Sequence, residues 1–124
     1  MIHEGNHPVV VVVDDDTAVL DSFRFLLEMA GFPVRVFSSG PALLAATPPR
    51  PRCVIADQHM PGMTGLELAM QLQASGMLAP LLLVTSSPSP AIIARAKEIG
   101  VRGVLEKPPN DDAVIAFIES CHPG

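Results

Sequence analysis

Cysteine is scarce in this sequence of 124 residues, which contains only Cys53 and Cys121. Two cysteines so far apart do not have the spacing of a metal site. They also do not make a disulfide framework in a chain with this much apolar sequence. Cys53 lies in an apolar run, and we expect it to be a small residue of the core.

Long hydrophobic runs are also lacking. The longest, residues 9–13 and 81–84, are far too short to span a bilayer. The first residues have neither the basic region nor the apolar stretch of a signal peptide. We therefore expect no membrane contact and a cytoplasmic protein, with residues 1–7 as a flexible N-terminal tail.

Positive charge is in the minority, with 8 Lys and Arg against 13 Asp and Glu and a net charge of −5. The arginines are scattered along the chain, so the sequence predicts no direct contact with nucleic acid. A hydrophobic content of 48% with 17% charged residues is typical of a globular protein. The length fits one domain spanning residues 1–124.

Short apolar runs alternate with amphipathic stretches along the whole chain. The apolar runs predict strands at 9–13, 34–37, 53–56, 81–84 and 101–105. The amphipathic stretches predict five helices, which follow residues 14–17, begin at Pro41, Thr64 and Pro90, and follow Asn110. Such alternation indicates an α/β protein with a parallel sheet covered on both faces.

The first and third predicted helices have the clearest local signals. Apolar residues of the first helix recur at helical spacing and predict its buried face: Val19, Phe23, Leu26, Leu27 and Ala30. Asp16 is expected to cap this helix, and Gly31 to end it. Residues 64–67, Thr-Gly-Leu-Glu, have the pattern of a capping box.

Chemically active residues follow four of the predicted strands. Asp14, Asp15 and Asp16 follow the first, Asp57 the third, Thr85 the fourth and Lys107 the fifth. Ligands of parallel sheets bind beyond the carboxyl ends of the strands, so these residues are expected to share one crevice. Two carboxylates about 4 Å apart repel by roughly 4 kcal/mol at an effective dielectric near 20. A hard cation such as Mg²⁺ would offset that repulsion.

This set of residues is suited to phosphoryl transfer, which depends on positioning and on neutralised oxygens. Asp57 can be the nucleophile, Lys107 can neutralise a phosphoryl oxygen, and Thr85 can donate a hydrogen bond.

The motifs resemble those of the receiver domains of two-component response regulators, the CheY-like superfamily. The matching segments cover nearly the whole chain and occur in the family's order and spacing: Val13-Asp14-Asp15, residues 57–65, Val84-Thr85 and Glu106-Lys107-Pro108. The resemblance implies a flavodoxin-like, doubly wound (βα)5 three-layer sandwich. Its five-stranded parallel sheet would have the order 2-1-3-4-5.

The resemblance also implies a metal site with Mg²⁺ as the cofactor and Mn²⁺ as a substitute. Asp15 and Asp57 would bind the ion directly, Asp14 would assist through water, and the backbone carbonyl of His59 would complete the protein ligands.

Residue roles in signalling follow from the same resemblance. Asp57 would be the phospho-acceptor, Lys107 would hold a phosphoryl oxygen, and Thr85 would move toward the phosphoryl group as a switch. The Lys107–Pro108 bond is often cis in this family. The implied donor is a sensor histidine kinase or a histidine phosphotransfer protein. A homodimer through the face from the fourth to the fifth helix is also implied, and turnover of an external substrate is not expected.

Val104 departs from the family pattern, because many receivers have Tyr or Phe at this position of the switch. Valine has no ring to rotate, and Pro88 and Pro90 stiffen the loop after Thr85. We therefore expect phosphorylation to change the surface over residues 91–105 less than in aromatic-switch receivers.

The sequence leaves open three alternatives to a phosphorylated receiver domain. A degenerate receiver that acts only as a protein-interaction module would fit the altered switch position. A flavodoxin-like cofactor binder would need a phosphate loop rich in Gly, Ser and Thr, where this chain has aspartates. A Mg²⁺-dependent hydrolase would need a substrate pocket beyond the acidic crevice.

Overall fold

The computed structural model describes residues 8–46, 48 and 50–121. The tail predicted for residues 1–7 lies outside these residues. Strands and helices alternate in the order β1 (Val10–Val13), α1 (Thr17–Met29), β2 (Val34–Phe37), α2 (Gly40–Ala46), β3 (Cys53–Asp57), α3 (Gly65–Ala74), β4 (Leu81–Thr85), α4 (Pro90–Ile99), β5 (Gly103–Glu106) and α5 (Asp111–Ser120).

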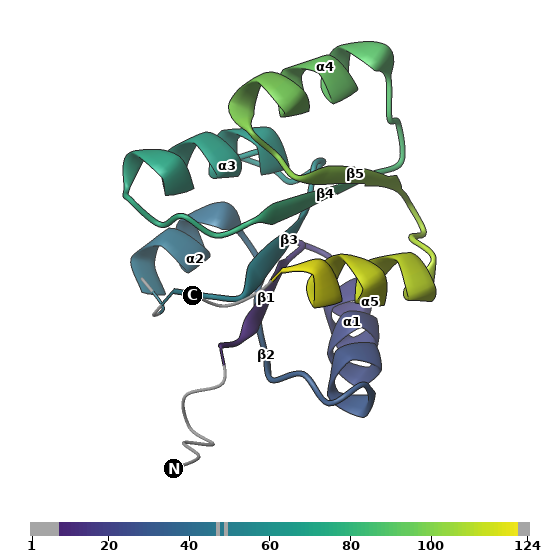
Figure 1. Ribbon diagram of the computed structural model, residues 1–124. Helices are drawn as coiled ribbons and strands as arrows, with labels where there is room; N and C mark the ends of the chain where they lie inside the picture. Colours follow the sequence, from purple (N-terminus) through teal and green to yellow (C-terminus); the bar gives the residue numbers. More distant parts are fainter. Residues whose placement is uncertain (1–7, 47, 49, 122–124) are drawn as a thin grey trace.

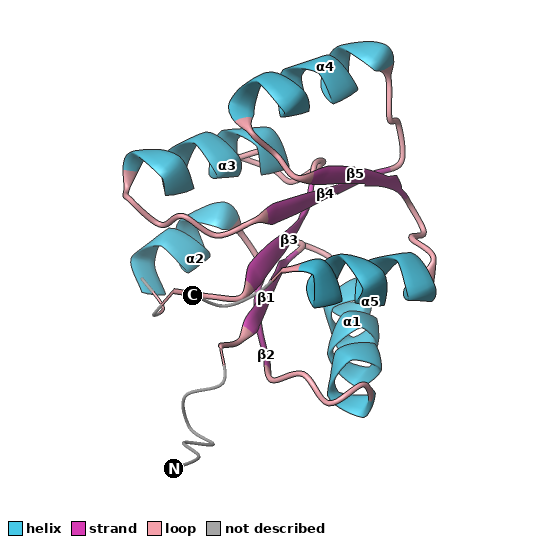
Figure 2. Ribbon diagram, in the orientation of Figure 1, coloured by secondary structure: helices cyan, strands magenta, loops and turns pink. Residues whose placement is uncertain are grey.

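The five strands form one parallel sheet in the order β2-β1-β3-β4-β5. Figures 1 and 2 show α1 and α5 on one face of this sheet and α2, α3 and α4 on the other. The predicted doubly wound, three-layer α/β fold and its strand order are confirmed. Among the described residues, no helix is both long and apolar enough to cross a membrane.

Alternate side chains of each central strand pack into the two layers of the core, one on each face of the sheet. Val11 and Val13 pack with residues of α2, α3 and α4, whereas Val10 and Val12 pack with residues of α1 and α5. Every residue of β1, β3 and β4 is buried, because helices cover both faces of these strands. This explains why their sequences are apolar runs instead of alternating patterns. Cys53 and Cys121 are free and buried, and the prediction of Cys53 as a core residue is confirmed.

Local signals fix the predicted helix ends. The Asp16 carboxylate caps α1 by accepting from the backbone N–H groups of Ala18 and Val19, as predicted. Thr64 and Glu67 form the predicted capping box of α3. Gly31, just after α1, has a φ of 92°, a conformation that favours glycine because other residues strain there.

The predicted buried face of α1 was partly wrong. Leu20, Phe23 and Leu27 are its buried residues, whereas Ala30 is exposed. Val19 and Leu26 lie at the margin of the core and are half-buried. The apolar positions of this helix are too numerous for periodicity alone to select the stripe that the sheet covers.

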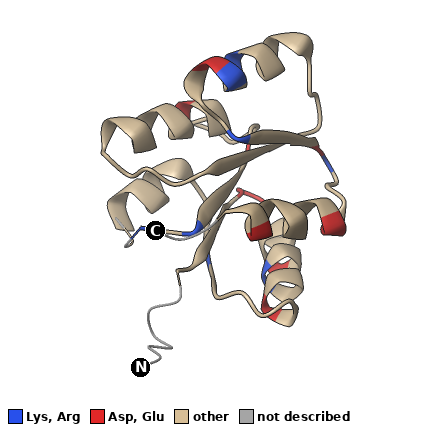
Figure 3. Ribbon diagram, in the orientation of Figure 1, with Lys and Arg blue, Asp and Glu red and all other residues tan. Residues whose placement is uncertain are grey.

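The fifth strand differs from its prediction at both ends. It begins at Gly103, two residues later than expected, and extends through Glu106. The Val101 N–H donates to the carbonyl of Ala96, so this valine completes the end of α4 instead of entering the sheet. Figure 3 shows the Lys and Arg residues distributed over several elements, and α4 carries both Arg95 and Lys97.

Candidate functional site

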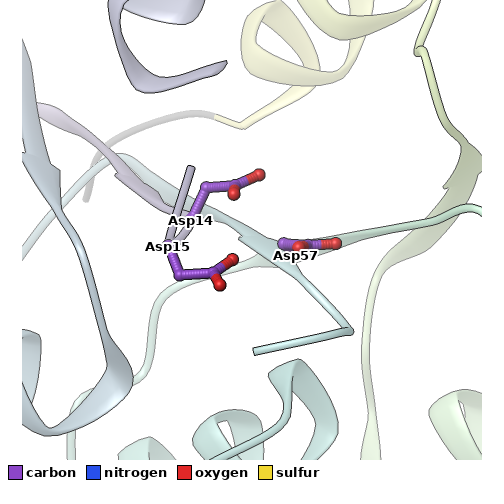
Figure 4. A group of neighbouring side chains, drawn as sticks. All are labelled: Asp14, Asp15 and Asp57. Atoms are coloured by element: carbon purple, nitrogen blue, oxygen red, sulfur yellow. The ribbon is translucent and has the colours of Figure 1, made fainter. Parts of the chain in front are cut away.

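The carboxyl ends of the parallel strands bring the predicted residues to one edge of the sheet. Asp14 and Asp15 follow β1, while Asp57 is the last residue of β3. One carboxylate oxygen from each of these residues lies within 4.8 Å of the others. Figure 4 shows the three side chains side by side at this edge. The structure thus assembles the carboxylate cluster that the sequence predicted.

Asp57 is 5% exposed, and its two oxygens have different surroundings. Oδ2 lies 3.3 Å from Nζ of Lys107. Oδ1 is buried and has no hydrogen-bond partner among the described residues. A buried carboxylate oxygen without a partner is costly, so Oδ1 indicates the place where a ligand would supply the missing interaction.

Asp14 is a buried carboxylate held by two donors. Its Oδ1 accepts from the Asp16 N–H at 2.9 Å, and its Oδ2 accepts from Lys107 Nζ at 3.0 Å. Burial raises the pKa of Asp14 above its usual value, and the neighbouring charge of Asp57 adds to this effect. The hydrogen bonds from Asp16 and Lys107 oppose the increase without cancelling it.

Lys107 bridges the two buried carboxylates. Burial works against its charged form, but the hydrogen bond and charge of Asp14, followed by the charge of Asp57, outweigh burial and raise the pKa of Lys107. The ammonium is therefore a fixed positive charge at neutral pH. Its backbone N–H donates to the Thr85 carbonyl at 2.9 Å, and the Lys107–Pro108 bond is cis.

The donor set fits a divalent cation. Asp15 is exposed, whereas Asp14 and Asp57 are buried, so the cluster opens to solvent on one side. Three carboxylates against one ammonium leave an excess of two formal negative charges. Hard oxygen ligands and an orphaned carboxylate oxygen suit Mg²⁺, which keeps several coordination positions for water and phosphate oxygens.

Thr85 ends β4 beside this cluster and is fully buried. Its Oγ1 accepts from the Ser87 N–H at 3.1 Å and lies 3.0 Å from Nε2 of His59. The contact between Thr85 and His59 has no signal in the sequence, because it joins the end of β4 to the loop that follows β3. The predicted role of the His59 carbonyl as a metal ligand remains a prediction.

Two further residues position Asp57, and sequence analysis did not assign them this role. The Gln58 side-chain carbonyl accepts from the Leu66 N–H at 2.9 Å, which ties the end of β3 to the start of α3. Gly65 allows that close approach, since a Cβ there would lie 2.8 Å from the Asp57 carbonyl oxygen. Gly65 was visible as part of a capping box, whereas its contact with Asp57 depends on the tertiary fold.

Val104 lies opposite Leu83 in the sheet and is half-buried. It packs against the core cluster shared with α4. A small branched side chain therefore fills the place at which the resemblance led us to expect an aromatic ring.

A sequence profile of the response regulator receiver domain matches residues 10–119. The chain belongs to this family. As a receiver domain of the two-component response regulators, it carries the acidic residues and Lys107 at the sheet edge described above.

The curated relatives of this receiver domain include a transcriptional regulatory protein and a response regulator. It is 39% identical over 112 residues to the transcriptional regulatory protein FixJ of Bradyrhizobium diazoefficiens, covering 90% of this chain and 55% of FixJ. It is 35% identical over 100 residues to the response regulator MprA of Mycolicibacterium vanbaalenii, covering 80% of this chain and 43% of MprA. The chain thus spans about half the length of the curated relatives it matches.

Solved structures show the same fold. Full-length FixJ from B. japonicum superposes with a TM-score of 0.83 at 37% identity, covering 92% of this chain and 57% of FixJ. The chemotaxis protein CheY4 of Vibrio cholerae has a TM-score of 0.84 at 28% identity, covering 93% of this chain and 98% of CheY4.

Proposed function

We propose that this receiver domain accepts a phosphoryl group on Asp57 from a phosphohistidine, in a Mg²⁺-dependent reaction that switches protein–protein contacts. The supporting observation is Asp57 Oδ1, which is buried, lacks a partner among the described residues, and belongs to the carboxylate cluster. Lys107 touches the other oxygen of the same carboxylate. A nucleophile and a fixed positive charge therefore meet at one point of the sheet edge.

The chain's own groups define the reaction. Asp57 forms an oxygen–phosphorus bond while the phosphorus–nitrogen bond of the phosphohistidine donor breaks. The electron pair of the broken bond stays on the imidazole nitrogen of the donor. Lys107 Nζ neutralises charge on the phosphoryl oxygens. Bound Mg²⁺, held by Asp14, Asp15 and Asp57 with the His59 carbonyl, would further neutralise those oxygens. Hydrolysis of the acyl phosphate returns the domain to its starting state, and no external substrate is turned over.

An apolar groove beside the site supports a protein donor. The groove of about 830 Å³ extends from Lys107, Pro108 and Pro109 to α1. Phe25 and Met29, on its α1 wall, are 69% and 74% exposed. Both side chains belong to one apolar lining, and contiguous exposed apolar patches are typical of protein-interaction sites. Because Lys107 also touches Asp57, a kinase or phosphotransfer protein in this groove would reach the acceptor.

Mass spectrometry after treatment with phosphoramidate and Mg²⁺ tests the proposal. The wild-type chain should gain one phosphoryl group, and Asp57→Ala should gain none. Asp21→Ala, which removes an exposed carboxylate of α1, is the matched control and should be labelled normally. Labelling of Asp57→Ala to the wild-type level, or labelling that persists in a metal chelator, would rule the proposal out.

A further inference from the structure

The Thr85 hydroxyl has an unusual environment for a group beside a phosphorylation site. Thr85 is fully buried, so its hydroxyl depends on protein partners. Its oxygen accepts one hydrogen bond from the backbone N–H of Ser87. The imidazole of His59 supplies the second contact, with Nε2 at 3.0 Å from Oγ1.

Accounting for the hydroxyl proton decides the direction of this second hydrogen bond. A threonine hydroxyl has one proton to donate, and a buried O–H without an acceptor is costly. The Ser87 N–H donates to the hydroxyl oxygen, so it cannot accept the hydroxyl proton. Among the described residues, the hydrogen-bond contacts of Thr85 include one possible acceptor, Nε2 of His59. Thr85 therefore donates to Nε2. The imidazole proton then lies on Nδ1, which can donate to solvent because His59 is exposed.

The loop that carries His59 is held on both sides. The Gln58 N–H donates to the Val84 carbonyl at 2.9 Å, and the Gln58 side chain accepts from Leu66. Met60, the next residue after His59, is buried. The imidazole is thus presented from a fixed backbone, which lowers the entropic cost of its hydrogen bond to Thr85.

We propose that His59 is a positioning residue whose Nε2 accepts a hydrogen bond from the Thr85 hydroxyl in the unphosphorylated protein. When Asp57 is phosphorylated, the Thr85 hydroxyl donates to the phosphoryl group instead. This inference rests on the proposed phosphorylation of Asp57. The exchange forms and breaks no covalent bond: the Thr85 O–H changes its acceptor from Nε2 to a phosphoryl oxygen. A charged oxygen is the stronger acceptor, so phosphorylation drives the exchange. The lost hydrogen bond to His59 lowers the apparent affinity of the site for phosphoryl groups.

The tautomer of His59 gives a direct test that needs neither metal nor phosphate. Nitrogen-15 NMR of the imidazoles in the metal-free chain, at a pH where histidine is neutral, should show His59 with a protonated Nδ1 and a hydrogen-bonded, unprotonated Nε2. His59→Gln identifies the signal among the four histidines of the sequence. A protonated Nε2 would overturn the proposal, because Thr85 could then not donate to it.

Binding of beryllofluoride, a phosphoryl mimic, with Mg²⁺ tests the consequence. His59→Phe keeps a ring without an acceptor and should bind the mimic about two- to tenfold more tightly, the worth of one net hydrogen bond. His59→Gln, whose amide carbonyl is an acceptor, should restore an affinity near that of the wild type. In a Thr85→Ala background, His59→Phe should have no effect on binding.

Each contrary result has a distinct meaning. Weaker binding by His59→Phe, or an equal effect with and without the Thr85 hydroxyl, would overturn the role of His59. Failure of the wild-type chain to bind beryllofluoride would overturn the proposed function. The tautomer measured without ligand would still decide whether Thr85 donates to His59.

Discussion

Lys107 and Asp14 are 93 positions apart in the sequence, yet Nζ of the lysine donates to Oδ2 of the aspartate at 3.0 Å. The same ammonium lies 3.3 Å from Asp57 Oδ2. One side chain at the end of β5 therefore balances carboxylates from the ends of β1 and β3. The ammonium of Lys107 therefore both stabilises the fold and offsets the negative charge of the site.

Removal of this ammonium should destabilise the metal-free protein. Lys107→Met leaves two buried carboxylates without their donor and counter-charge, which should lower the free energy of unfolding by about 1–3 kcal/mol. Saturating Mg²⁺ should reduce the deficit, because the cation replaces the lost charge. Urea unfolding with and without Mg²⁺ measures both effects. Lys97→Met on the exposed side of α4 is the control, and an equal loss there would argue against this explanation.

As the pH is lowered, the affinity for Mg²⁺ should begin to fall at a higher pH than it would with carboxylates of ordinary pKa. Burial raises the pKa of Asp14 above 3.8, so protons compete with the metal as the pH falls through that raised value. Above it, the affinity should be independent of Asp14 titration. Calorimetric titration across pH tests this, with proton release measured in two buffers. Asp14→Asn should lose the pH-dependent component, and retention of that component would contradict the prediction.

Gly65 should be far less tolerant of a methyl group than Gly40. A Cβ on Gly65 would lie 2.5 Å from Leu83 Cδ1 and 2.8 Å from the Asp57 carbonyl oxygen. Gly65→Ala should cost at least about 2 kcal/mol of stability and reduce phosphorylation, because the backbone at Asp57 must shift. Gly40→Ala meets mainly the flexible end of Met63 and should cost less than about 1 kcal/mol. Chemical denaturation compares the two variants, and equal losses would count against this contact.

The exposed face of α1 should matter for a protein donor and not for a small one. Phe25→Ser and Met29→Ser should slow phosphorylation by an autophosphorylated sensor kinase about tenfold, as for residues that anchor an interface. Phosphoramidate should label both variants at the wild-type rate, because it needs no docking surface. Ile93→Ser removes an exposed apolar residue of α4 and serves as the control. If the variants were slowed equally with the kinase and with phosphoramidate, the defect would lie in the phosphorylation site, and the groove would not be the docking surface.

Phosphorylation should alter residues 91–105 only slightly. Val104 is a branched side chain packed against the core cluster, and it has no ring that can follow Thr85. Hydrogen exchange with and without beryllofluoride and Mg²⁺ should therefore differ little over this segment. Val104→Tyr should enlarge the difference. A large deprotection in the wild-type chain would show that the segment responds without an aromatic residue.

The sequence by itself determined the fold class and the edge at which the site lies. Five apolar runs separated by amphipathic stretches require a parallel sheet covered on both faces, and β1, β3 and β4 are fully buried as such runs demand. Residues that follow parallel strands necessarily meet at one edge. The positions of Asp14, Asp57, Thr85 and Lys107 were therefore predictable from their places along the chain.

Only the tertiary structure decided how those side chains pair. The unpartnered oxygen of Asp57, the contact of His59 with Thr85 and the tie between Gln58 and α3 depend on loop paths and side-chain rotamers. The buried stripe of α1 was likewise decided by packing, which selected Leu20 from several apolar positions. Periodicity is a local property of the chain. These pairings join segments that meet only after the sheet has formed.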